Sequence, residues 1–223
     1  DNTRGKSSVL AAIYYCLGLE QILGGVGGIG PKVLTAAYKS SLQDGDAHHT
    51  VLESGAFLEI SNGIKTITIF RSITHESKDP HLLTVYFGEY SEIGNPKIQF
   101  HDYYVHMPNS ATNERGFHTF LASFLHLDLP IVTSSDGNER KLYLQVIFSA
   151  MFIEQKHGWA SILSGMPILG IRESKKRVVE FILNLDTLRN ERERNQLKEI
   201  KAQLEREWDL LILGIQHQCN YQS

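Results

Sequence analysis

The middle of the chain alternates apolar and polar residues with the two-residue period of β-strands. FLEIS and KTITIFRSI lie on either side of Asn62-Gly63, a dipeptide that tolerates the positive φ of a hairpin turn. The segments LLTVYFG and KIQFHDYYVH continue the pattern through Val105. We therefore predict a β-hairpin followed by further strands between Gly55 and Val105.

Apolar residues spaced three and four apart predict helices before and after these strands. SSVLAAIYYCLG is apolar on nearly all sides, which predicts a buried helix that Gly18 would end. A second helix is predicted over residues 113–126, because four of its apolar residues fall on one face. These residues are Phe117, Phe120, Leu121 and Leu125.

Three further segments have weaker patterns. Residues 31–41 predict a short helical piece, and Asp136-Gly137-Asn138 predicts a turn. The apolar stretch 141–155 fits a helix, a strand, or one followed by the other.

The final third of the chain predicts two helices in succession. Residues 172–188 carry apolar side chains at a helical period, and a charge-rich helix follows from residue 189. Its apolar residues are Leu197, Ile200, Leu204, Trp208, Leu211 and Ile215. This spacing is typical of the start of a coiled coil, although an amphipathic surface helix accounts for it equally well.

Composition places the chain among ordinary globular proteins. Its 223 residues are 42% hydrophobic and 21% charged, which is enough apolar material for a substantial core. The net charge of -3 gives no global field that would attract nucleic acid, so DNA contact needs a local patch. The candidate patch is Arg172, Lys175, Lys176 and Arg177, which a solvated helix face explains about as well.

Cysteine usage and hydropathy indicate the cellular compartment in which the protein is found. The two cysteines, Cys16 and Cys219, do not form a disulfide framework, which favours a reducing environment. No apolar run approaches the roughly 20 residues that span a bilayer, and no signal peptide is visible. We therefore expect a cytoplasmic protein without membrane contact.

The sharpest motif stands at the start of the chain, in DNTRGKSS. It matches the phosphate-binding loop G-x-x-x-x-G-K-[ST] if the first glycine precedes Asp1, so we expect the sequence to be part of a longer protein. In such a loop, backbone N–H groups and the positive end of the following helix hold phosphate oxygens. Lys6 would reach the β- and γ-phosphates, and the Ser7 hydroxyl would coordinate Mg²⁺.

Other candidate motifs fit their chemistry less well. Residues 25–30 match G-x-G-x-x-G, but they follow a predicted helix, whereas a dinucleotide site follows a strand, so a loop is expected. The pairs His48-His49 and His101 with His106 lack the cysteine or carboxylate partners of a metal site, which favours solvated or packed histidines. No G-x-S-x-G supports a serine hydrolase.

A polar pair, Glu154-Gln155, closes the apolar run in FSAMFIEQKHGWASIL. The pattern is that of a buried strand that ends in a loop, which is where ligands bind in α/β folds. A surface turn is the alternative interpretation.

Taken in order, these segments resemble the N-terminal half of the ATPase head of SMC-like proteins, nearest to the SbcC-type ATPases of double-strand-break repair. NTRGKSSVLAAIYYCLG resembles the family's N-x-x-G-K-S-S loop and helix, with Asn2 on the family's asparagine. FLEISNGIKTITIFRSI is similar to the hairpin that follows, and MFIEQKHGWASIL to the Q-loop. RESKKRVVEFILNLDTLRNERERNQLKEI resembles the connection from head to coiled coil. Thr3, Arg4 and the long stretch 89–140 depart from the family's pattern.

The resemblance implies an α/β fold, a P-loop NTPase half-head of the ABC/SMC type with β-hairpins, over residues 1–188. The beginning of a coiled coil would occupy residues 189–223. ATP and Mg²⁺ are the implied cofactors, and Gln155 would contact both the metal ion, together with Ser7, and the attacking water. The implied nucleotide-binding residues are Asn2, Thr3, Arg4, Gly5, Lys6, Ser7 and Ser8.

In this family a signature motif, a Walker B aspartate and a catalytic glutamate belong to a second half of the head, which this sequence does not contain. Asp186 in LNLD precedes a charged helix and does not end a strand, so it is not assigned to Walker B. We expect the full-length protein to be an ATPase that forms homodimers through ATP-bound heads and acts on DNA, at the nucleoid or elsewhere in the cytoplasm. A nuclease or effector subunit is the expected partner, and this chain alone is expected to be inactive.

Three alternatives remain open. The chain fits the ATPase component of a bacterial anti-phage defence system, because such systems use the same head. A nucleotide-free coiled-coil scaffold is supported by Thr3 and Arg4 in the loop. Another P-loop enzyme, such as a kinase, predicts a compact domain without long helices.

Overall fold

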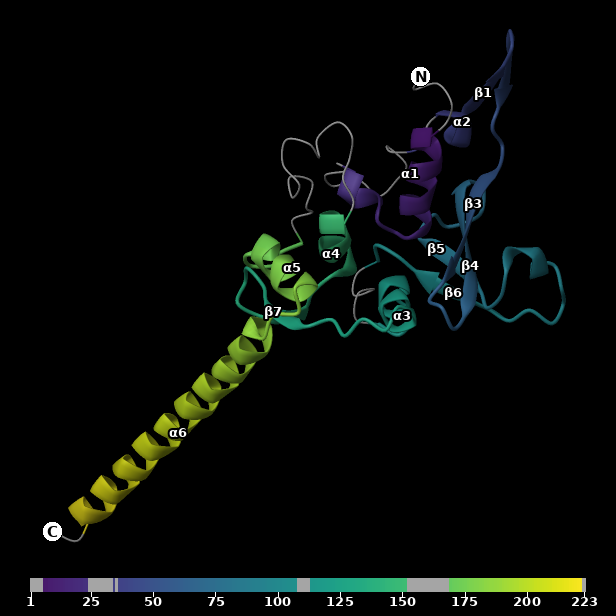
Figure 1. The fold of residues 1–223 in the computed structure, drawn as a ribbon. Coiled ribbons are helices and arrows are strands. Elements are labelled where there is room, and N and C mark those ends of the chain that lie inside the picture. The colour runs from purple at the N-terminus through teal and green to yellow at the C-terminus, as the bar shows by residue number, and fades with distance from the viewer. Residues whose placement is uncertain (1–5, 24–33, 35, 108–112, 152–168, 222–223) are drawn as a thin grey trace.

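The computed structural model describes residues 6–23, 34, 36–107, 113–151 and 169–221 (Figure 1). Its helices are α1 (Lys6–Cys16), α2 (Ala36–Lys39), α3 (Phe117–Phe124), α4 (Leu144–Met151), α5 (Ser174–Ile182) and α6 (Thr187–Tyr221), with short 3-10 turns η1 (Glu20–Leu23) and η2 (Tyr90–Glu92). Its strands are β1 (Ser41–Asp44), β2 (Ala47–Thr50), β3 (Ser54–Ser61), β4 (Thr66–Thr74), β5 (Leu82–Tyr86), β6 (Phe100–Tyr104), β7 (Ile131–Thr133) and β8 (Glu139–Lys141).

A four-stranded antiparallel sheet in the order β3-β4-β5-β6 forms the centre of the fold. The predicted hairpin is confirmed, because β3 and β4 pair with Phe57 opposite Phe70. In the connecting turn Gly63 has a φ of 87°, and the Asn62 side chain accepts hydrogen bonds from the N–H groups of Ile64 and Lys65. The predicted strands after the hairpin are confirmed as β5 and β6.

Helices α1 and α3 bury one face of this sheet. The core combines Tyr14 and Leu17 at the end of α1, Ile69 and Val85 from the sheet, and Phe117 from α3. The two helices confirm the predictions for SSVLAAIYYCLG and for 113–126. Burial of α1 is one-sided, however, since Val9 and Leu10 are exposed near its start.

A second, smaller core joins the chain segments on the other side of α3. Its buried residues are Val132, Leu142, Val146, Ile147, Ile171 and Val178, from β7, α4 and α5 and the residues that flank them. The β7-β8 hairpin confirms the predicted turn at residues 136–138, where Gly137 has a φ of 85°. The apolar run 141–155 was expected to be a helix, a strand or one followed by the other, and it is helical over α4 as far as Met151, where the described part ends. The interpretation as a buried strand that leads to Gln155 is wrong for this part. Five of the first six residues of α4 are buried, so the run shows no one-sided period.

Helix α6 projects away from the rest of the molecule (Figure 1). The predicted helical segment 172–188 is divided, because α5 ends at Ile182 and Asn184 adopts a φ of 49° before α6 begins. Among the described helices, none combines the length and the apolar character that crossing a bilayer requires.

The structure therefore has a mixed α/β fold whose sheets, in the part of the chain that is described, are all antiparallel. The long C-terminal helix agrees with the predicted charge-rich helix from residue 189, although it starts at Thr187. The expected P-loop half-head and the division at residue 188 stay predictions.

Candidate functional site

The candidate phosphate loop leads directly into α1. Lys6 is the first residue of this helix, and Ser7 and Ser8 lie in its first turn. The first backbone N–H groups of a helix have no partner within the helix, and the helix dipole adds a partial positive charge there. The helix thus starts at the position that the Gly-Lys-Ser motif requires for binding an anion.

The remaining predicted site residues lie outside the described part. Asn2, Thr3, Arg4 and Gly5 precede it, and Gln155 falls in the segment 152–168. The side chains of Lys6 and Ser7 are likewise not described, and that of Ser8 is half-buried. The proposed contacts of these residues with phosphate and Mg²⁺ therefore stay predictions.

The glycine-rich run 25–30, for which a loop is predicted, also falls outside the described residues.

The opposite end of α1 is held by a buried group of charges that the sequence did not reveal. Arg71 on β4 lies 2.9 Å from Glu20, and the two side chains are 1% and 3% exposed. His106 Nε2 lies 3.0 Å from the same carboxylate oxygen of Glu20. We refer to Arg71, Glu20 and His106 as the buried charge cluster.

Arg71 joins this cluster to the backbone of α1. Its Nη1 group donates to the carbonyl oxygen of Tyr15 at 2.7 Å, and its Nε group donates to that of Pro80 at 2.9 Å. The guanidinium also lies 4.0 Å from the centre of the Tyr15 ring. A cation at the last turn of a helix is favourable, because the carbonyl groups there carry partial negative charge.

Tyr15 makes further contacts that join α1 to the sheet. Its hydroxyl donates to the carbonyl oxygen of Ser72 at 2.6 Å. Ala11 and Tyr15 also form a small apolar cluster with Leu34. Helix α1 is therefore fixed to β4 by charge, hydrogen bonds and packing together.

Burial by itself would raise the pKa of Glu20, but the hydrogen bond from His106 and the charge of Arg71 outweigh it and lower this pKa. Glu20 is therefore a carboxylate at neutral pH. Its Oε2 atom is buried and has no hydrogen-bond partner among the residues that the structure describes. The cluster is a structural anchor in this geometry, since its charges face one another.

A second buried histidine supports the turn after α1. His118 Nε2 donates to the carbonyl oxygen of Leu17 at 3.0 Å. Burial lowers the pKa of His118 to about 4, so its ring is neutral at physiological pH. Gly18 lies against this ring with a φ of 65°, which confirms it as the glycine that ends α1.

No group of three or more metal-binding side chains occurs within the described ranges. His48 and His49 are exposed on β2, and His101 is exposed on β6. His106, considered with His101 as a metal pair, contacts Glu20 instead. The prediction of solvated or packed histidines is thus confirmed for these four residues.

One sequence signal could have indicated that Arg71 has a buried partner. Arg71 interrupts the apolar alternation of KTITIFRSI, and a charge within a buried strand requires a partner. The identity of that partner was not readable, because Glu20 and His106 lie far from Arg71 in the sequence.

The basic patch on α5 is partly neutralised. Arg177 is buried and lies 3.1 Å from Glu180, while Lys176 lies 3.6 Å from Glu173. Arg172 and Lys175 are exposed. The patch therefore presents less positive charge to DNA than the sequence indicated.

Among the described residues, the start of α1 has the backbone arrangement that anion-binding helices use, and its other end is anchored to the sheet. In searches with this chain, no family model, no curated protein and no solved structure gave a match.

Proposed function

We propose that this chain is the N-terminal ATP-binding lobe of an SMC-like ATPase that acts on DNA, with a P-loop fold of the ABC/SMC type. The observation that carries the proposal is the start of α1 at Lys6, directly after the glycine of the Gly-Lys-Ser motif. A phosphate loop works only if a helix begins at this point, because the free N–H groups of its first turn complete the cradle.

In this proposal each motif residue has one task. Backbone N–H groups of residues 2–8 hold the phosphates, and Lys6 neutralises the β- and γ-phosphates. Ser7 and Gln155 would hold Mg²⁺, which would neutralise charge at the phosphates when bound. Gln155 would also orient the attacking water. Two ATP-bound heads of the full-length protein then associate in the cytoplasm, with a nuclease or effector subunit as partner.

The buried charge cluster supports this function indirectly. A helix that binds a phosphate group at its start must not shift along its axis when the ligand arrives. Arg71 binds the carbonyl of Tyr15 in the last turn of α1, and this contact resists such a shift. The antiparallel sheet behind α1 and the charge-rich helix α6 also agree with the expected order of elements.

The direct test is calorimetric titration of the 223-residue chain with a non-hydrolysable ATP analogue and Mg²⁺. We expect weak binding that Lys6→Ala lowers by at least about tenfold, since a charge-assisted contact with phosphate is lost. Lys65→Ala is the matched control, because Lys65 is exposed in the β3-β4 turn, and it should bind like the wild type. Absence of binding by the wild type, or equal binding by the Lys6→Ala variant, would contradict the proposal.

A turnover assay separates binding from catalysis. We expect no Mg²⁺-dependent ATP hydrolysis by this chain alone, because the motifs that complete the family's active site are not in its sequence. Measurable hydrolysis that Lys6→Ala abolishes would show that the chain is catalytically complete.

A nucleotide-free coiled-coil scaffold is the second candidate. The exposed apolar residues of α6 favour it, because they provide an interaction surface that needs no nucleotide. The calorimetric titration distinguishes the two, since a scaffold would not bind the ATP analogue.

A further inference from the structure

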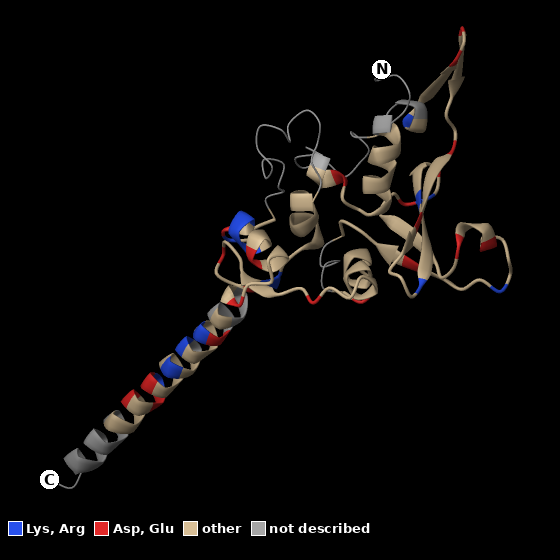
Figure 2. Cartoon of the chain, viewed as in Figure 1, with Lys and Arg blue, Asp and Glu red and all other residues tan. Residues whose placement is uncertain are grey.

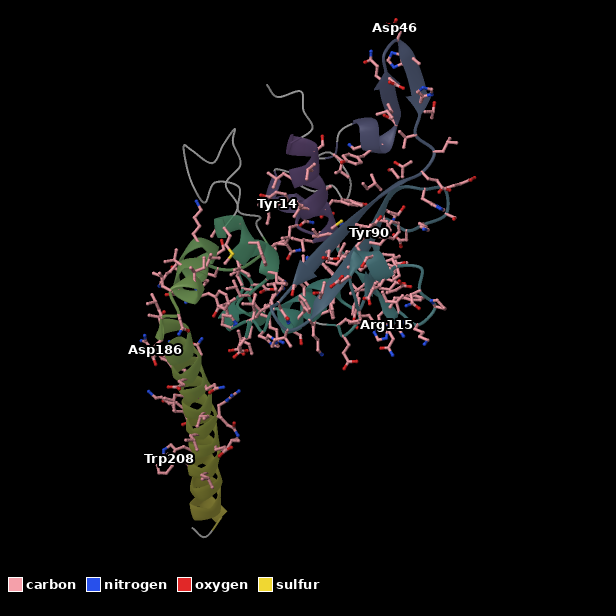
Figure 3. The ribbon with its side chains drawn as sticks, turned by 45° about the vertical axis from the view of Figure 1, so that its right-hand side comes forward. Tyr14, Asp46, Tyr90, Arg115, Asp186 and Trp208 are labelled. Atoms are coloured by element: carbon pink, nitrogen blue, oxygen red, sulfur yellow. The ribbon has the colours of Figure 1, made fainter. Side chains whose placement is uncertain are left out.

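Helix α1 packs on the core through its second half. Among its described side chains, burial begins at Ala11, whereas Val9 and Leu10 are 59% and 44% exposed. Figure 3 shows Tyr14 in the half of α1 that lies nearer the central sheet. An α-helix rises 1.5 Å per residue, so the described packing contacts of α1 lie about 7–15 Å from Lys6 along the axis.

Tyr15 is the residue of α1 that β4 binds at several points. Its hydroxyl donates to the carbonyl oxygen of Ser72 at 2.6 Å. The guanidinium of Arg71 lies 4.0 Å from the centre of its ring and donates to its backbone carbonyl at 2.7 Å. Because hydrogen bonds are directional, contacts at both the side chain and the backbone fix the helix along its axis and in its rotation about that axis.

The charge that stabilises this end of α1 comes from the sheet. The helix carries no charged side chain after Lys6, and Figure 2 shows that part of it without red or blue. Carbonyl groups in the last turn of a helix have partial negative charge, which a nearby cation stabilises. Arg71 supplies this cation from β4, with Glu20 as its counter-ion at 2.9 Å. The opposite end of the helix has partial positive charge, which an anion would stabilise in the same way.

A helix that is fixed near one end transmits small movements to its other end. Nine residues separate Lys6 from Tyr15, which is about 13 Å along the axis. A tilt of about 5° at Tyr15 would move the first turn by about 1 Å. A displacement of this size at a binding group is enough to lower its efficiency strongly. The contacts of Tyr15 therefore decide where the first N–H groups of α1 point.

We propose that Tyr15 is a positioning residue for the phosphate loop, which acts through α1 and does not touch the nucleotide. This inference rests on the proposed function, because it assigns Tyr15 a role in the affinity for ATP. It goes beyond a contribution to stability, since it couples the two ends of α1. By linkage, an anion bound at the start of the helix must then strengthen the anchor at its end.

Calorimetric titration with a non-hydrolysable ATP analogue and Mg²⁺ tests the effect of the anchor on affinity. We expect Tyr15→Phe, which removes only the hydroxyl, to raise the Kd at least about threefold under conditions where circular dichroism shows a folded chain. Tyr103→Phe is the matched control and should bind like the wild type. It removes the same group from a half-buried residue of the same core, whose ring stacks on Phe120 of α3.

The outcomes of this titration separate the inference from the function on which it rests. If the wild type binds and Tyr15→Phe binds equally well, the positioning role is wrong and the proposed function stands. Equal weakening by Tyr15→Phe and Tyr103→Phe would also overturn the positioning role, because a general loss of core packing would explain both. A wild type that does not bind contradicts the proposed function, and the positioning role is then rejected with it.

Hydrogen exchange tests the coupling in the other direction. The N–H groups of residues 17–19 donate to carbonyl groups near the end of α1 at 2.8–3.1 Å. The ATP analogue should slow exchange of these amides at least about threefold in the wild type, and by less in Tyr15→Phe, because coupling between two sites is reciprocal. Unchanged exchange at residues 17–19 in a wild type that binds the analogue would overturn the positioning role.

Discussion

Arg71 and Glu20 form an ion pair at 2.9 Å that joins β4 to the residues just after α1. Both side chains are almost completely buried, and His106 shares the carboxylate. Because Arg71 also binds the carbonyl of Tyr15, the pair connects the sheet to the helix that begins at Lys6. The stability of this contact therefore bears directly on the candidate phosphate loop.

Replacement of Arg71 should destabilise the fold strongly. Arg71→Met leaves the Glu20 carboxylate buried without its cation, for which we expect a loss of about 3–5 kcal/mol in the free energy of unfolding. Urea denaturation followed by circular dichroism measures this free energy.

Two further variants act as controls for Arg71→Met. Lys65→Met, at an exposed turn position, should change the free energy of unfolding by less than about 0.5 kcal/mol. A double variant, Arg71→Met with Glu20→Leu, should recover part of the loss, because neither member of the ion pair is left buried without the other. Similar losses for Arg71→Met and Lys65→Met would count against the role of the ion pair.

His118 should make stability depend on pH below neutrality. Its pKa falls to about 4 in the folded chain, so between about 6.5 and 4 the unfolded state binds the additional proton. The contribution is complete above pH of about 6.5 and is lost as pH falls toward 4. His118→Gln retains an N–H donor for Leu17 and should flatten the slope of unfolding free energy between pH 7 and pH 4.5, measured in urea. An unchanged slope would show that other groups dominate.

Two glycines with positive φ provide a matched comparison. A Cβ atom at Gly18 would lie 2.9 Å from His118 Nε2, whereas one at Gly63 would meet nothing within 4 Å. Gly63→Ala should cost about 1 kcal/mol from backbone strain alone. Gly18→Ala should cost clearly more, because the ring of His118 must also move. Thermal unfolding of both variants tests this, and equal losses would argue against tight packing at Gly18.

The Cys16 thiol should be unreactive in the folded chain. Burial raises its pKa to about 12, with the charge of Arg71 acting in the opposite direction, so little thiolate exists at neutral pH. In a Cys219→Ser background, we expect a disulfide reagent to label Cys16 at a rate that increases with urea and follows unfolding. Rapid labelling without urea would indicate that the end of α1 opens in the native state.

Local patterns in the sequence determined much of the fold. The β3-β4 hairpin followed from strand alternation around Asn62-Gly63, and the end of α1 followed from Gly18. Both depend on neighbouring residues only, so their backbone preferences are readable without a fold. The apolar spacing of the charge-rich helix is also a property of the sequence, although only the structure shows that its apolar residues, such as Leu204, are exposed.

Long-range contacts could be identified only from the tertiary structure. The residues that neutralise Arg71 come from distant segments, and no local rule selects Glu20 and His106 among the other charged residues and histidines. The helical state of α4 was likewise decided by packing, since apolar residues on nearly every side give no usable period. The sequence by itself determined the β3-β4 hairpin with the strands after it, the helices before and after these strands, and the phosphate-loop motif. Tertiary structure alone decided which charges are buried together, because burial makes an unpaired charge too costly to tolerate.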